Sequence, residues 1–380
     1  MILFNCTINN VGGGLKNSAL FIKYILDIGD NNWIFAISEQ VERLLLDLNC
    51  KLDHRFKVYT KSPAWSISSR KQLVKMAEKK EVIGIYTMAG PTYCKFSKYH
   101  IMGISNPYIS HFKHADLLRT IAIRKIPEVY ARIAYQIIHS TAANHFIFQT
   151  MESASGFSFR RKIPIQSCTV VPNAVDLDSF SSFKKEVRSF SEKLPFYIAV
   201  PGNPFGHKCI QLLVRYALEL KNMGASNIVF KVTLTDEEFE ATIRRQKGYN
   251  STKHMFENFG RVSYTRMKDF YSQADIVFVP SVLETFSATY VEALAAFKPL
   301  VVSDRSFARE ICGDTAKYVD TFDVTNVAST LLTLARSVTD RNNSITSGGK
   351  KLSQFTNQRE RNAQLANFVR QQLALSQKYN

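Results

Sequence analysis

Short runs of apolar residues that are typical of buried β-strands alternate with helical patterns along most of this chain. Such alternation indicates β-α-β units, which assemble into largely parallel, doubly wound sheets. A run at residues 1–9 precedes Gly12-Gly13-Gly14 and a helical pattern, and a run at 196–200 starts a second series of the same kind. The other strand-like runs lie at 33–37, 82–88, 100–105, 146–149, 228–234, 276–280 and 300–303. The sequence therefore predicts an α/β protein with two such sheets.

The length of 380 residues is too great for one small core and suits two domains of ordinary size. Residues 177–194 are polar and rich in serine and lysine, and we interpret them as a linker between the domains. The stretch 340–349 is predicted to be a loop, and the C-terminal residues 358–380 have the pattern of a polar amphipathic helix. We expect Rossmann-like domains at 1–183 and 184–357, with the final helix packing back on the N-terminal domain.

The net charge of +17, from 49 lysines and arginines against 32 aspartates and glutamates, is far from neutral. Such an excess favours a polyanionic partner, which can be nucleic acid, anionic lipid or a phosphorylated substrate, although it also fits a merely soluble surface. Basic residues gather at 51–81, at 119–132 and at Arg160-Arg161-Lys162, and apolar side chains are interleaved in the first two clusters. Clusters of this kind suit docking on an anionic membrane face.

Targeting and covalent features point to the cytoplasm. No stretch approaches the ~20 apolar residues of a membrane span, and the first residues lack the basic start of a signal peptide. The six cysteines lie far apart without any C-x-x-C pair, which argues against a zinc site and a disulfide framework and fits a reducing compartment. We therefore expect a cytoplasmic protein that has no bound metal.

The clearest functional signal runs from Glu284 to Glu292. A predicted strand ends at Pro280, and a helix is predicted to begin near Ser287, with Thr285 or Ser287 as its N-cap. Ligands of open α/β sheets bind at the carboxyl ends of strands, and helix N-terminal amides favour a diphosphate. The two carboxylates can reach opposite ends of an elongated ligand and accept hydrogen bonds from sugar or ribose hydroxyls. Spacing alone favours a simpler interpretation, in which one acid complements the helix dipole and the other is an unrelated surface glutamate.

Several further segments accompany this Glu-x7-Glu pair in a fixed order. They are V-V-P-N-A-V-D at 170–176, a predicted strand F-G-R-V at 259–262, A-D-I-V-F-V-P-S at 274–281, K-P-L-V-V-S at 298–303 and E-I-C-G-D at 310–314. The ordered set resembles the retaining GT-B glycosyltransferases, in particular glycosyltransferase family 4, over the whole second domain and more loosely over the first. The resemblance implies two Rossmann-like domains facing a central cleft and a metal-independent, retaining hexosyltransferase that uses a nucleotide-sugar.

The same resemblance implies roles for the residues of the Glu-x7-Glu segment. Glu292 is expected to bind the ribose hydroxyls of the donor, and Glu284 is expected to contact the transferred sugar. Thr285, Phe286 and Ser287 are expected to supply contacts near the sugar and the phosphate. The nucleotide-sugar is a co-substrate in this interpretation, and we expect no cofactor.

The diphosphate end of the donor site departs from the family pattern. The family normally places an arginine and a lysine five residues apart after the first strand of the second domain. Lys208 keeps the lysine position, at a predicted helix N-terminus, whereas Asn203 stands where the arginine would be. Because a neutral amide cannot neutralise phosphate charge, His207 or another basic residue is expected to compensate, or the donor is held differently. A solvated lysine is the plain alternative for Lys208.

Two loops complete the predicted donor site. The resemblance implies that Gly12, Gly13 and Gly14 let the first-domain loop approach the diphosphate without a side-chain clash, although a plain tight turn explains them as well. The loop from Arg261 to Tyr264, which includes Val262, is expected to contact the nucleotide base. Nothing in this loop distinguishes uridine from guanosine.

The acceptor side of the first domain is less well marked. The family often places a histidine after a strand here, and His111 is the nearest candidate, although a lone histidine is more often structural. Tyr93 and Asn106 follow two predicted strands and are expected to line the acceptor side. The candidate catalytic residues are thus Glu284, Lys208 and His111.

These observations predict an enzyme that moves a sugar from a nucleotide-sugar to a lipid-linked or growing surface polysaccharide, as in bacterial O-antigen or capsule assembly. We expect it to lie peripherally on the inner face of the plasma membrane. A soluble-acceptor transferase and a nucleotide-sugar epimerase of the same fold are alternatives, and product formation without an acceptor distinguishes the epimerase. A basic nucleic-acid-binding protein predicts salt-sensitive binding, but the chain has no recognisable nucleic-acid motif, so we expect no nucleic-acid partner.

Overall fold

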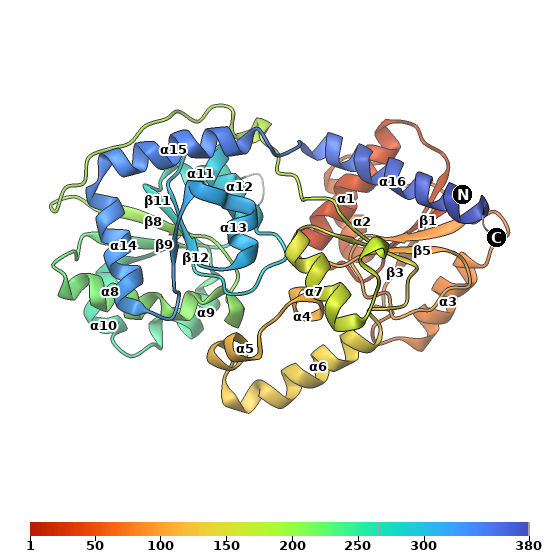
Figure 1. Ribbon diagram of the computed structural model, residues 1–380, viewed down its shortest axis with the longest axis horizontal. Helices are drawn as coiled ribbons and strands as arrows, with labels where there is room; N and C mark the ends of the chain where they lie inside the picture. The colour runs from red at the N-terminus through yellow and green to blue at the C-terminus, as the bar shows by residue number, and fades with distance from the viewer. Residues whose placement is uncertain (264–265, 379–380) are drawn as a thin grey trace. The chain divides into compact units, whose positions relative to one another are not determined.

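The computed structural model describes residues 1–263 and 266–378 (Figure 1). Tyr264 of the predicted base-contacting loop and the last two residues of the predicted C-terminal helix lie outside these ranges. Contacts between residues divide the chain into two compact units. Unit 1 consists of Met1–Phe112, Arg124–Asn173 and the C-terminal segment from Gln358, and unit 2 consists of Lys113–Ile123 and Ala174–Asn357. The chain thus passes from one unit to the other after Phe112, Ile123, Asn173 and Asn357.

Unit 1 is built on a seven-stranded sheet in the order β3-β2-β1-β4-β5-β6-β7, and all neighbouring strands pair in parallel. Its strands are β1 (Ile2–Cys6), β2 (Trp33–Ser38), β3 (Phe56–Tyr59), β4 (Gly84–Thr87), β5 (His100–Gly103), β6 (His145–Phe148) and β7 (Cys168–Val170). Its helices are α1 (Gly12–Asp27), α2 (Glu39–Asp47), α3 (Ile67–Ala77), α4 (Pro107–Ser110), α6 (Ile126–Ile138), α7 (Met151–Arg161) and α16 (Gln358–Lys378).

The core of unit 1 joins the first strand to the last helix. The Phe4 ring of β1 stacks on Phe21 of α1, with 4.9 Å between the ring centroids, and contacts the edge of Trp33. Leu365 and Val369 of α16 belong to the same buried cluster, and Figure 1 shows α16 lying along unit 1. The strands beneath are apolar on both faces because helices cover both sides of a doubly wound sheet.

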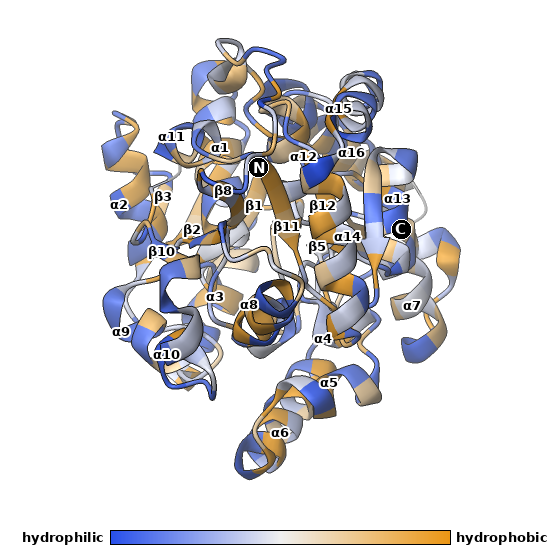
Figure 2. Ribbon diagram, turned by 90° about the vertical axis from the view of Figure 1, so that its left-hand side faces the viewer, coloured by the Kyte–Doolittle hydropathy of each residue, from blue (hydrophilic) through white to orange (hydrophobic). Residues whose placement is uncertain are grey.

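Unit 2 has a six-stranded, fully parallel sheet in the order β10-β9-β8-β11-β12-β13. Its strands are β8 (Phe196–Val200), β9 (Ile228–Val232), β10 (Phe256–Asn258), β11 (Ile276–Val279), β12 (Leu300–Ser303) and β13 (Ala316–Val319). Its helices are α5 (His114–Thr120), α8 (Leu213–Asn222), α9 (Asp236–Phe239), α10 (Tyr249–Thr252), α11 (Met267–Ser272), α12 (Ala288–Ala295), α13 (Ser306–Cys312), α14 (Val324–Arg336) and α15 (Val338–Leu352). Figure 2 shows β1 and β11 in the hydrophobic colour, whereas α8 carries both colours. The predicted α/β class with two parallel sheets is confirmed.

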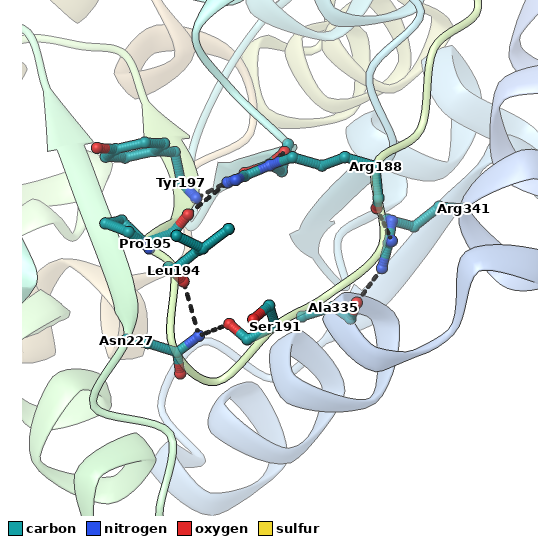
Figure 3. Close-up of polar contacts among 9 residues, drawn as sticks. Arg188, Ser191, Leu194, Pro195, Tyr197, Asn227, Ala335 and Arg341 are labelled. Carbon is teal, nitrogen blue, oxygen red and sulfur yellow. Dashed lines mark hydrogen bonds and ion pairs between the residues drawn. The ribbon is translucent and has the colours of Figure 1, made fainter.

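The stretch interpreted as a linker is fastened to unit 2 over its second half (Figure 3). Arg188 forms an ion pair with Asp275, and its carbonyl accepts a hydrogen bond of 2.6 Å from Arg341. Asn227 Nδ2 donates to the carbonyl of Ser191 at 2.9 Å. Side chains thus satisfy backbone groups that no regular element pairs. This segment is therefore an ordered part of unit 2, and the chain changes units before it, after Asn173.

Two local predictions were wrong. The stretch 340–349 lies inside α15, where Ser337 caps the helix by accepting a hydrogen bond from Asp340 N at 3.1 Å. A Cβ at Gly348 would lie 2.9 Å from Leu294 Cδ2, so glycine at this position permits close packing between α15 and α12. The predicted strand at 259–262 follows β10, which ends at Asn258.

Buried His100 predicts an acid-sensitive fold. Its Nδ1 lies 2.7 Å from the Ala142 carbonyl, which can only accept, so Nδ1 carries a proton, and its Nε2 faces the Thr87 hydroxyl at 2.9 Å. Burial lowers the pKa of His100 to about 4. Because this lies below the value near 6.5 of an unfolded histidine, the stabilisation is complete above pH 6.5 and is lost as the pH falls toward 4.

We therefore expect the contribution of His100 to the free energy of unfolding to fall by about 3 kcal/mol between pH 7 and pH 4. Urea unfolding of the wild type and of His100→Gln at both pH values tests this expectation. The free energy of unfolding should fall further between pH 7 and pH 4 in the wild type than in the variant, and the difference is the contribution of His100. Equal acid losses in the two proteins would contradict the prediction.

Candidate functional site

The predicted donor residues of unit 2 follow three strands of its sheet. Lys208 lies beyond the carboxyl end of β8, Arg261 beyond that of β10, and Glu284 beyond that of β11. Because all strands of this sheet are parallel, these ends share one edge, which is where open α/β sheets bind ligands. The edge of unit 2 therefore gathers residues that are far apart in the sequence.

Lys208 and Glu284 form an ion pair at the centre of this edge. Their side chains are only 20% and 11% exposed. The backbone also joins the two segments, since Val282 N donates to the carbonyl of His207 at 2.9 Å. Lys208 sits in a short 3-10 turn, Gly206–Lys208, and α8 begins only at Leu213, so the predicted helix N-terminus at Lys208 was wrong.

The charges of this pair are set by opposing effects. Burial acts to raise the pKa of Glu284, but the nearby charge of Lys208 and hydrogen bonds outweigh it and hold that pKa below its ordinary value. Burial lowers the pKa of neighbouring His207 to about 4. At neutral pH and without a donor, Glu284 is thus ionised and His207 is neutral.

A different cation stands beside Asn203. Arg261 donates a hydrogen bond from its guanidinium to Asn203 Oδ1 and forms an ion pair with Glu238. Glu238 is itself fixed, because its carboxylate accepts a hydrogen bond of 2.9 Å from Thr235 N in the capping box of α9. The guanidinium is therefore oriented beside the position where the family has an arginine, and half-buried Val262 follows it.

Glu292 lies in the second turn of α12 and is buried. The Tyr271 hydroxyl of α11 donates to Glu292 Oε2 at 2.9 Å. Ser287, one of the two predicted alternatives, occupies the N-cap position of α12 with an extended backbone, but its side chain makes no capping hydrogen bond. Thr285 and Phe286 precede it and are also buried. The contact of Tyr271 with Glu292 was not predicted from the sequence, since it depends on the packing of α11 against α12.

In unit 1, the three glycines form the first turn of α1, which begins at Gly12. Gly12 has a φ of +64°, in the left-handed region that favours glycine. A Cβ added at Gly12 or Gly13 would have no described atom within 4 Å, and one at Gly14 would lie 3.6 Å from Asn9. The backbone of this turn is therefore open on the side of Gly12 and Gly13.

The three remaining predicted residues separate into two groups in unit 1. The Tyr93 ring stacks on Tyr135 of α6 with 5.3 Å between centroids, and Asn106 Nδ2 donates to Gln136 of α6 at 2.9 Å. His111 instead lies beside α7, with its Nδ1 2.7 Å from the Ser110 hydroxyl and 3.3 Å from that of Ser153. α6 thus brings Tyr93 and Asn106 together, whereas His111 belongs to another cluster.

No group of three His, Cys, Asp or Glu side chains within residues 1–263 and 266–378 is arranged to hold a metal ion. In the same ranges, none of the helices combines the length and the apolar character needed to cross a membrane.

Comparison with known proteins identifies the fold. Residues 183–351 match the family model of glycosyl transferases group 1. Among solved structures, HepE from Anabaena in complex with UDP and glucose aligns with a TM-score of 0.70 and 16% identity, covering 97% of this chain and 99% of that chain. WaaG, a glycosyltransferase involved in lipopolysaccharide biosynthesis, aligns with a TM-score of 0.70 and 11% identity over 97% and 99% of the two chains. Sucrose-phosphate synthase from Thermosynechococcus elongatus aligns with a TM-score of 0.69 and 13% identity, covering 98% of this chain and 99% of that chain.

No curated protein sequence matches the chain. At such low identities the structural likenesses establish the GT-B fold, and the family match concerns the second half of the chain. The fold of the whole chain and the family match of its second half together support a glycosyltransferase of the GT-B type.

Proposed function

We propose that this protein is a retaining, metal-independent glycosyltransferase that takes its sugar from a nucleotide-sugar held by unit 2. The observation that carries the proposal is the largely buried ion pair of Lys208 and Glu284, at the carboxyl edge of the sheet and inside the segment that matches group 1 glycosyltransferases. Isolated carboxylates and ammonium groups are costly to bury, so a pair retained at a ligand-binding edge suggests a functional role.

Each end of the donor has a partner in this proposal. Glu292 accepts hydrogen bonds from the ribose, and Glu284 accepts them from hydroxyls of the transferred sugar. Lys208 and the first-turn amides of α12 contact the diphosphate, and Arg261 supplies the second positive charge that Asn203 lacks. Thr285, Phe286 and Ser287 line the path between the sugar and the phosphate.

The reaction follows from this placement of charge. The bond between the anomeric carbon and the departing phosphate oxygen breaks, and the acceptor hydroxyl oxygen bonds to the same face of that carbon. The departing phosphate oxygen takes the proton of the acceptor. Preorganised cations and amides at the diphosphate stabilise the developing negative charge, which is usually the largest catalytic contribution. The open turn at Gly12, Gly13 and Gly14, and His111, Tyr93 and Asn106, serve the diphosphate and acceptor sides from unit 1.

A donor that binds the native protein must raise its stability. We expect one or more of UDP-glucose, UDP-N-acetylglucosamine, GDP-mannose and ADP-glucose to raise the free energy of unfolding by about 2.7 kcal/mol at a concentration 100 times its Kd. A thermal-shift series with each nucleotide-sugar, without added metal, measures this effect. If none of them raised the Tm at millimolar concentration, the proposed function would fail.

We further propose that the acceptor is a lipid-linked or growing surface polysaccharide at the anionic inner face of the plasma membrane. Unit 1 supports this with exposed basic residues next to exposed apolar ones. Trp65 is 80% exposed, and Lys71 and Lys75 are exposed nearby in the sequence. Arg124 is exposed as well, and it directly follows Ile123, the last residue of the unit 2 stretch 113–123, which is 84% exposed. Arg119, which belongs to the second predicted basic cluster, is exposed and lies over the Phe322 ring of unit 2.

Vesicle binding tests the membrane proposal. We expect co-sedimentation with vesicles of phosphatidylcholine and phosphatidylglycerol at low salt, and weaker binding at high salt, since each basic residue near the surface contributes up to about 1 kcal/mol. The double variant Lys71→Glu/Lys75→Glu should bind less, whereas Lys193→Glu/Lys317→Glu, in exposed positions of unit 2, is the matched control. Equal binding to vesicles with and without phosphatidylglycerol would exclude this acceptor location.

A soluble-acceptor transferase or an epimerase of the same fold would share the donor site. Product formation from the nucleotide-sugar alone would identify an epimerase, whereas transfer requires the acceptor.

A further inference from the structure

The segment Lys113–Ile123, here named the α5 segment, lies between two stretches of unit 1 in the sequence but groups with unit 2. Two contacts and one buried side chain hold it there. Asp116 Oδ1 forms an ion pair of 3.0 Å with Arg305, the N-cap residue of α13, and both side chains are partly buried. Leu117 is buried, and the Arg119 guanidinium lies 5.0 Å from the centroid of the Phe322 ring. The α5 segment is thus a docked part of unit 2.

The end of α5 meets the turn that carries Lys208. A Cβ at Gly206 would lie 2.4 Å from the carbonyl oxygen of Thr120, a distance that side-chain carbons essentially never adopt. The Thr120 hydroxyl donates to the carbonyl of Asp116 at 2.9 Å, which holds this last turn in place. Only glycine fits at position 206 without a steric clash, because the backbone at the end of α5 packs directly against the turn.

The turn is held from its other side as well. The carbonyl of Gly206 accepts hydrogen bonds from Cys209 N at 3.0 Å and from Gln211 Nε2 at 3.2 Å. The carbonyl of His207 accepts from Val282 N, in the loop that leads to Glu284. The turn is thus enclosed between the α5 segment and the loop after β11, and the position of Lys208 depends on both.

We infer that the α5 segment positions the Lys208–Glu284 pair, so that the donor site within residues 183–351 is completed by a piece of chain from outside that range. Asp116 and Gly206 are positioning residues, since they act through the turn. The inference rests on the proposed function, because it assigns the pair to donor binding. Both ends of the α5 segment continue into unit 1.

The test uses the full-length protein and two glycine variants. Gly206→Ala must displace the Thr120 carbonyl, whereas Gly349→Ala, where a Cβ meets no described atom within 4 Å, is the matched control. We expect Gly206→Ala to raise the Kd for UDP, GDP or ADP, whichever binds the wild type, at least tenfold by calorimetry. Hydrogen exchange at the Val282 amide should be faster in Gly206→Ala and unchanged in Gly349→Ala.

The Asp116–Arg305 pair gives a second test with a rescue. Asp116→Arg and Arg305→Asp should each weaken nucleotide binding by about tenfold, and the double variant should restore it, because opposite charges again face each other. If Gly206→Ala matched Gly349→Ala in both affinity and exchange, or if the double variant were no better than the single ones, the α5 segment would have no positioning role. If the wild type bound none of the three nucleotides, the proposed function would fail, and the exchange comparison would still decide on the positioning role.

Discussion

Replacing Lys208 by alanine is expected to lower kcat/KM for sugar transfer by at least about 100-fold, the usual cost of removing one preorganised group that stabilises developing charge. The proposed role places its ammonium on the departing diphosphate, which gains further negative charge as the bond breaks, so kcat should fall along with kcat/KM. Initial rates at saturating and limiting donor concentrations measure both. Lys317→Ala removes an exposed lysine of unit 2 and should leave the rates unchanged.

The same variant should change the pH dependence of transfer. In the wild type, Lys208 helps to hold the pKa of Glu284 below its ordinary value, against the effect of burial. Without the lysine, burial acts on Glu284 with less opposition, and its pKa should rise. The acid limb of the pH–rate profile is therefore expected at higher pH in Lys208→Ala than in the wild type. Activity within threefold of wild type, or an unshifted acid limb, would contradict the assigned role of the pair.

Glu292→Ala is expected to weaken donor binding by roughly ten- to 100-fold, since hydrogen bonds to a charged group contribute about 1.5–3 kcal/mol each. It should also lower stability by about 1–3 kcal/mol, because the buried Tyr271 hydroxyl loses the acceptor that it contacts at 2.9 Å. Calorimetric titration with the donor and urea unfolding separate the two effects. The alanine variant alone does not distinguish a ligand contact from a structural one.

Two further variants make that distinction. Glu292→Gln keeps an acceptor for Tyr271 but removes the charge, so its stability should stay close to wild type while donor affinity falls. Tyr271→Phe removes the hydroxyl donor and keeps the carboxylate, so it should retain most of the donor affinity. If Glu292→Gln bound the donor as tightly as wild type, the assignment of Glu292 to the ribose would be wrong.

Local sequence patterns were sufficient to predict the positions of the central strands of both sheets. Buried parallel strands are short apolar runs, so 196–200 and 300–303 were predicted with the bounds of β8 and β12. Local patterns gave the wrong prediction for 340–349, which lies inside α15. Gly348 does not break this helix but allows α12 to pack closely against it. Whether a glycine ends a helix or permits its packing depends on a neighbour that is distant in the sequence.

The candidate site divides in the same way. The loop before α12, with Ser287 as its N-cap, follows from strand, loop and helix signals within a few residues. The contact between the Arg261 guanidinium and Asn203 does not follow from local signals. The two residues are 58 positions apart and meet only because the strands that precede them belong to one sheet. Burial likewise decides that His207 is neutral, and the sequence carries no measure of that burial.

The docking of α5 on the turn at Gly206 limits how this molecule can be recombined. Donor-binding halves of two-domain enzymes are natural units to exchange between proteins, and residues 174–357 look like such a cassette in a linear map of the chain. A chimaera made by exchanging that cassette alone would receive an α5 from one parent and a Gly206 turn from another. The turn would stay intact only if the α5 backbone of the other parent left the same space for it. Compatible exchanges should therefore carry residues 113–123 together with residues 174–357.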